Sequence, residues 1–102
     1  MKEKDMKKTE ITTLEEARSA IDKVDNDLKE AFLARMELVD RIAVIKAGSG
    51  SQVYNPDREK AMIRRLTADV EPRFRESYIR FLEEMLCISK EYQKKRMEQE
   101  KP

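Results

Sequence analysis

An apolar stripe runs from Leu14 to Ile45 with no glycine or proline before Gly48, and it constrains the fold more than any other feature. Its members recur at alternating steps of three and four, the pattern of a helix that packs against other helices. They are Leu14, Ala17, Ile21, Val24, Leu28, Ala31, Leu38, Ile42 and Ile45. Thr13 and Glu16 form a capping-box pattern at its start. The pattern predicts a helix over about residues 13–46, roughly 50 Å long at 1.5 Å per residue.

A helix of that length is too long for the rest of a 102-residue chain to cover. A compact domain of this size has a radius of gyration of only about 13 Å. The simplest remedy is a second copy of the chain lying alongside the first. The length and the pattern therefore predict a homodimer.

The remaining chain predicts two further helices. Residues 47–55, which hold both glycines, predict a loop. Asn55 and Pro56 then predict the start of a short helix that ends before Pro72 and turns Met62, Leu66 and Val70 inward. A third helix follows to about residue 96, and its apolar side comprises Phe74, Tyr78, Phe81, Leu82, Met85, Ile88 and Tyr92. We therefore expect an all-α fold of three helices (long, short, long), with a domain over residues 12–96 and charged tails at 1–11 and 97–102.

Composition narrows the classes of function. The net charge is +1, which gives no basic field for nucleic acid, and the apolar runs are far too short to span a membrane. Cys87 is the only cysteine, so no intrachain disulfide can form and a cytoplasmic location is expected. Histidine, the commonest general base and metal ligand, is absent. An enzyme with this composition is expected to need neither metal nor imidazole.

Four cations lie in or beside the apolar stripes. Arg35 occupies a position where the step from Ala31 to Leu38 calls for an apolar residue, and an unpaired buried charge is very costly. The other three are Arg18 and Lys46 near the ends of the first stripe, and Arg58 four residues before Met62. Taken together, cations without matching acids in the stripe favour a pocket for a small dianion.

Three further polar residues fall at positions that can turn inward. Glu59 precedes Ile63 by four residues, and Ser89 and Gln93 continue a column that begins at Met85. Structural explanations compete with a functional one for all of these residues. A single arginine among the apolar residues of a helix interface can set the helix register or extend its charged end to solvent. Ser89 and Gln93 can form a solvated helix face. Arg58 and Glu59 can serve helix capping and interact with the helix dipole.

The spacing of two arginines also bears on the dimer. Arg18 and Arg35 are 17 residues apart, about 25 Å along one helix, so they cannot grip the same small molecule. If two copies of the helix pack antiparallel about a dyad near residues 26–27, Arg18 of one copy lies level with Arg35 of the other. Two identical composite sites would result.

These residues in this order resemble the all-helical type II chorismate mutases. The resemblance rests on Arg18, Ile21-Asp22-x-x-Asp25-x-x-Leu28, Arg35, Lys46, Val53-Tyr54-Asn55-Pro56-Asp57-Arg58-Glu59 and Ser89-x-x-x-Gln93. It covers about residues 12–96. The resemblance implies an intertwined homodimer that rearranges chorismate, a small-molecule substrate, to prephenate on the route to phenylalanine and tyrosine.

The resemblance also implies a role for each site residue. Arg35 and the partner's Arg18 would hold the substrate's carboxylates, with Arg58 in the same cationic cage, and Lys46 and Gln93 would hydrogen-bond the ether oxygen. Glu59 would hold the C4 hydroxyl, Ser89 would line the carboxylate end, and Asn55, where an aspartate often stands, would contribute mainly a backbone contact.

A Claisen rearrangement agrees with the missing histidine because it is intramolecular and transfers no proton. It requires a restrained near-attack geometry and donors at the ether oxygen, and neither a cofactor nor a metal. Two alternatives stay open. One is isochorismate–pyruvate lyase on the same fold, whose members lack the glutamate and serine found here at Glu59 and Ser89. The other is a helical dimerisation module without catalysis, which does not explain the cations.

Overall fold

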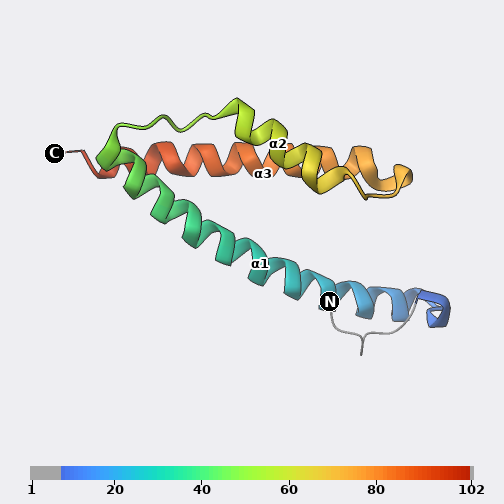
Figure 1. Cartoon of the computed structure of the whole chain (residues 1–102). Coiled ribbons are helices and arrows are strands. Elements are labelled where there is room, and N and C mark those ends of the chain that lie inside the picture. Colours follow the sequence, from blue (N-terminus) through green and yellow to red (C-terminus); the bar gives the residue numbers. More distant parts are fainter. Residues whose placement is uncertain (1–7, 102) are drawn as a thin grey trace. The chain divides into compact units, whose positions relative to one another are not determined.

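Three α-helices and one short 3-10 helix make up the part of the chain that the computed structural model describes, residues 8–101. The 3-10 helix η1 (Lys8–Glu10) precedes α1 (Leu14–Ser49), α2 (Pro56–Thr67) and α3 (Pro72–Gln99) (Figure 1). No strand occurs in residues 8–101, so the predicted all-α class is confirmed. Residues 1–7 of the predicted tail and Pro102 lie outside the described residues.

The chain divides into two compact units, which are described separately. The first unit is Met1–Arg35 and the second is Met36–Pro102, so the boundary falls within α1.

The first unit consists mainly of the N-terminal part of α1. Its start is the predicted capping box: the Glu16 N–H donates to Thr13 Oγ1 at 3.0 Å, and the Thr13 N–H donates to Glu16 Oε1 at 3.1 Å. Hydrogen bonds from the Thr12 and Thr13 N–H groups lower the pKa of the Glu16 carboxyl. Beyond this cap, every residue from Ile21 to Ala34 is exposed, apolar ones included.

The second unit packs the last part of α1 together with α2 and α3. Its buried apolar residues are Val39, Ala43, Leu82 and Leu86, and α2 lies alongside α3 (Figure 1). On α1, the intrachain contact therefore uses the face of Val39 and Ala43. The stripe residues Leu38, Ile42 and Ile45 are exposed in the single chain, because the face that the chain itself covers lies next to the stripe.

The side of α3 that is buried within the chain carries two polar residues. The positions that the chain covers are Leu82, Leu86, Ser89 and Gln93, at steps of four, three and four. Most of the predicted apolar side is exposed, namely Phe74, Phe81, Ile88 and Tyr92. Ser89 and Gln93 were among the positions expected to be able to turn inward, and within a single chain the side that carries them is the buried one.

The ends of the helices follow local rules. At φ +74°, Gly50 ends α1 three residues beyond the predicted end, and residues 50–55 form the loop. The Asn55 side chain caps α2 by accepting from the Arg58 N–H at 3.2 Å, and Pro56 follows as expected. At the other end of α2, the Arg75 guanidinium donates to the carbonyls of Thr67 and Val70.

Candidate functional site

A lysine and a glutamine from different helices meet in the second unit. Lys46 lies in the last turn of α1 and is half-buried, whereas Gln93 lies on α3 and is 8% exposed. Lys46 Nζ donates to Gln93 Oε1 at 3.0 Å and to the Val53 carbonyl at 3.1 Å. An ammonium group has three N–H donors. The two contacts thus use two of the three donors and fix the position of the ammonium.

The lysine also determines how the Gln93 amide is turned. An ammonium group cannot accept a hydrogen bond, so the amide must present its oxygen to Lys46. The amide nitrogen, with its two N–H donors, is then left to act elsewhere. The pair therefore places a charged donor and a neutral donor side by side. The role that the resemblance implies for them at the ether oxygen stays a prediction.

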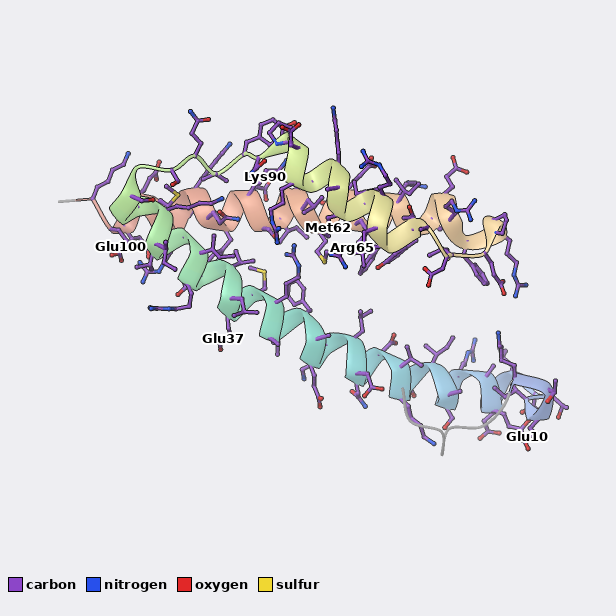
Figure 2. The ribbon with its side chains drawn as sticks, viewed as in Figure 1. Glu10, Glu37, Met62, Arg65, Lys90 and Glu100 are labelled. Atoms are coloured by element: carbon purple, nitrogen blue, oxygen red, sulfur yellow. The ribbon has the colours of Figure 1, made fainter. Side chains whose placement is uncertain are left out.

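A second charged pair links α2 to α3. Glu59 and Lys90 form a salt bridge, with Nζ 3.1 Å from Oε2 and 3.3 Å from Oε1, and both side chains are half-buried. The Lys90 ammonium also lies 4.6 Å from the centroid of the Tyr54 ring. Glu59 was predicted as a site residue, whereas Lys90, which is labelled in Figure 2, was not. The sequence could have indicated Lys90 as a site residue, because it follows Leu86 by four residues and precedes Gln93 by three, which places it near both on the helix surface.

The other predicted residues of the second unit have simpler surroundings. Ser89 is 3% exposed and its hydroxyl donates to the Met85 carbonyl at 2.9 Å, a bond within the helix. Asn55 caps α2, as described above, and is exposed. Arg58 supplies the N–H for that cap, and its side chain is exposed.

Arg18 and Arg35 belong to the first unit. Arg18 is exposed and Arg35 is half-buried, and both lie on α1. The 17 residues between them correspond to about 25 Å of helix. A single copy of α1 therefore does not bring these two guanidinium groups to one small molecule.

A polar cluster that sequence reasoning did not single out joins α1 to α3. Asp40 accepts from the Tyr92 hydroxyl at 2.6 Å and from Arg96 Nε at 2.9 Å, and Arg96 also pairs with Glu100. The hydrogen bond from Tyr92, with the nearby Arg96, lowers the pKa of Asp40. The same bond raises the pKa of the Tyr92 hydroxyl. These contacts tie the C-terminal part of α3 to α1, which is a structural role.

Little in the described residues points to metal or thiol chemistry. Between residues 8 and 101 there is no cluster of three or more Cys, Asp or Glu that could hold a metal ion. Cys87 is exposed, and the neighbouring Glu91 carboxylate raises the pKa of its thiol, which disfavours the nucleophilic thiolate. None of the helices in this range has an apolar stretch long enough to cross a membrane.

Comparisons with known proteins point to one family. The sequence model described as "Chorismate mutase type II" matches residues 17–94, which is more than half of the chain. A T-protein from Haemophilus influenzae is 40% identical over 61 residues, which cover 58% of this chain and 16% of that protein. The chain thus spans only a small part of the length of this relative. No solved structure matches the chain.

Proposed function

We propose that this chain, which belongs to the type II chorismate mutase family, catalyses the rearrangement of chorismate to prephenate in phenylalanine and tyrosine biosynthesis. The observation that carries the proposal is the contact between Lys46 and Gln93 in a chain of this family. The proposed catalytic domain covers residues 12–96 and acts in the cytoplasm without cofactor or metal.

Lys46 and Gln93 serve as donors to the substrate's ether oxygen. Negative charge grows on this oxygen as its bond to the ring carbon breaks, and fixed donors stabilise it without reorganising. Lys46 has a third N–H available and Gln93 has its amide nitrogen, and their mutual hydrogen bond at 3.0 Å holds both in place. Because no proton is transferred in the reaction, neither group has to act as an acid or a base.

Cations hold the two carboxylates of the substrate. In the proposed site Arg35 and the partner's Arg18 bind them, and Arg58 belongs to the same cationic cage. Guanidinium groups suit this task because their planar donors match a carboxylate. Glu59 accepts from the ring hydroxyl, Ser89 lines the carboxylate end, and Asn55 contributes mainly a backbone contact. Together these contacts restrain the substrate close to its reacting conformation.

The site is completed in a homodimer. Arg18 and Arg35 are too far apart along α1 to act on one molecule, so a second copy has to supply Arg18. The exposed apolar residues of the first unit support this, because Ile21, Val24 and Leu28 are 56%, 46% and 48% exposed. A contiguous apolar surface of this kind marks an interaction site.

The test is an absorbance assay of chorismate loss with identification of the product. Prephenate as the product supports the proposal, and pyruvate released from isochorismate indicates the lyase instead. Lys46→Met should lower kcat by about 10²–10³-fold, the usual effect of removing one transition-state donor. Lys94→Met is the matched control, because Lys94 is an exposed lysine of α3. Full activity of Lys46→Met would contradict the assignment.

A further inference from the structure

Lys90 joins three elements of the second unit. It lies on α3 (Figure 2), contacts both carboxylate oxygens of Glu59 on α2 at 3.1 and 3.3 Å, and stands 4.6 Å from the centroid of the Tyr54 ring in the loop. It is placed on α3 between Ser89 and Gln93, both of which are buried. No residue of the ordered set that carries the family resemblance has this role.

The geometry of the salt bridge fixes the Glu59 carboxylate. The two distances from Nζ differ by only 0.2 Å (3.3 Å against 3.1 Å), so one ammonium holds both oxygens and restricts rotation of the group. An ionised carboxylate has about four lone-pair sites. Those that Lys90 does not use can accept from a substrate hydroxyl.

The charge of Lys90 has a separate effect. Glu59 places a negative charge in a site proposed to bind a dianion, and like charges disfavour each other there. The side chains of Lys90 and Glu59 are only 28% and 21% exposed, so water screens this pair less than a surface pair. Lys90 offsets the charge of Glu59 at the point where an unpaired carboxylate would repel the substrate.

We propose that Lys90 is a positioning residue of this site, which orients Glu59 as a hydroxyl acceptor and cancels its charge toward the dianionic substrate. The proposal rests on the proposed function, since it takes chorismate as the ligand. Lys90 acts through Glu59 and does not itself touch the reacting atoms. Its effect should therefore depend on the presence of a carboxylate at position 59.

The test is a four-way comparison of the wild type, Lys90→Met, Glu59→Gln and the double variant. In the wild-type background Lys90→Met should raise KM about tenfold or more, the loss usual for a hydrogen bond to a charged group, with a smaller change in kcat. In the Glu59→Gln background the same change should raise KM by less than about threefold, because no charge is left to offset. Lys90→Arg, which keeps the charge, should stay close to the wild type.

Two measurements separate this role from a merely structural one. Thermal unfolding followed by circular dichroism reports whether each variant is folded, and Lys94→Met provides the same loss of charge at an exposed position of α3. A salt bridge that only stabilises the fold would shift Tm and leave KM unchanged, and that result would overturn the proposal. An equal rise of KM in both backgrounds would also overturn it, because Lys90 would then act independently of Glu59.

The dissociation constant of chorismate, measured by equilibrium dialysis for the same variants, distinguishes the two proposals. If the wild type binds chorismate without converting it, the proposed reaction fails, and the comparison of dissociation constants still decides the role of Lys90. If the wild type binds no chorismate, both proposals are overturned.

Discussion

Replacing Gln93 by glutamate tests the proposed chemistry most directly. The two side chains have nearly the same shape, so the variant changes the donor and leaves the volume of the buried site almost unchanged. In the structure Gln93 Oε1 accepts from Lys46 at 3.0 Å, and a carboxyl oxygen can accept in the same way. The fold should therefore tolerate the substitution, while the amide donor is replaced by a group that donates only when protonated.

The size of the effect follows from this titration. An ionised carboxylate next to the ether oxygen offers no donor and repels the developing charge. Loss of one such donor costs about 10²–10³ in kcat. Because only the protonated fraction is active, activity should fall about tenfold per pH unit over two to three units, to a floor. Lys46 favours the ionised form of the introduced carboxyl, and the dianionic substrate favours its protonated form. The pH at the midpoint of the activity loss therefore reports the balance of these two effects.

The assay is kcat and kcat/KM measured between about pH 5 and 9 for the wild type, Gln93→Glu and Gln93→Met. The wild-type amide does not titrate, so its contribution should be the same at every pH. Gln93→Met lacks the donor throughout and should be slow at every pH. Gln93→Glu should approach the wild type in acid and the methionine variant in alkali. Profiles of the same shape for Gln93→Glu and the wild type would refute the contact between Gln93 and the ether oxygen.

Three further predictions concern other parts of the chain. Arg35→Ala should nearly abolish turnover without unfolding, and mixing it with Arg18→Ala should restore roughly a quarter of wild-type activity if subunits exchange at random; no recovery despite verified exchange would exclude a composite site. Asp40 has a lowered pKa because Tyr92 donates to it, so its stabilising effect is present above the unfolded-state pKa and is lost as the pH falls through the folded-state value. The difference in Tm between the wild type and Asp40→Asn should therefore shrink in acid, and a constant difference would contradict this. Asn55→Ala should lower the free energy of unfolding by about 1 kcal/mol, measured with urea, because α2 loses its cap, whereas Asn55→Asp should cost little.

Local sequence rules were sufficient to predict the three helices and the residues that start α1 and α2. Thr13 with Glu16, and Asn55 with Pro56, act through groups three or four residues apart, and the structure contains both caps. The end of α1 was predicted less closely, because Gly48 is compatible with a last helical turn and it is Gly50 that adopts a positive φ. Caps depend on neighbours in the chain, and this is why they can be read from one sequence.

Contacts between distant residues could not be predicted in the same way. A period of three and four residues shows that α1 has an apolar side, but it does not say that the chain itself covers the neighbouring face with Val39 and Ala43. Lys90 and Glu59 are 31 residues apart, and their pairing depends on how α2 lies along α3. Lys46 and Gln93 were named as site residues through the family resemblance. Nothing in their spacing of 47 residues indicates that they contact each other.

The distribution of polar and apolar residues bears on the dimer as well. In the described part of the chain the buried residues include Ser89 and Gln93, whereas Val24 and Leu28 are about half exposed. A chain that acted alone would gain by burying Val24 and Leu28, because burying apolar groups is favourable, whereas Ser89 and Gln93 are buried at little cost only because they are hydrogen-bonded. A second copy that covers the apolar residues of the first unit would remove that imbalance. The buried amide would then be explained by a ligand that needs its N–H donors, which is the role proposed for Gln93.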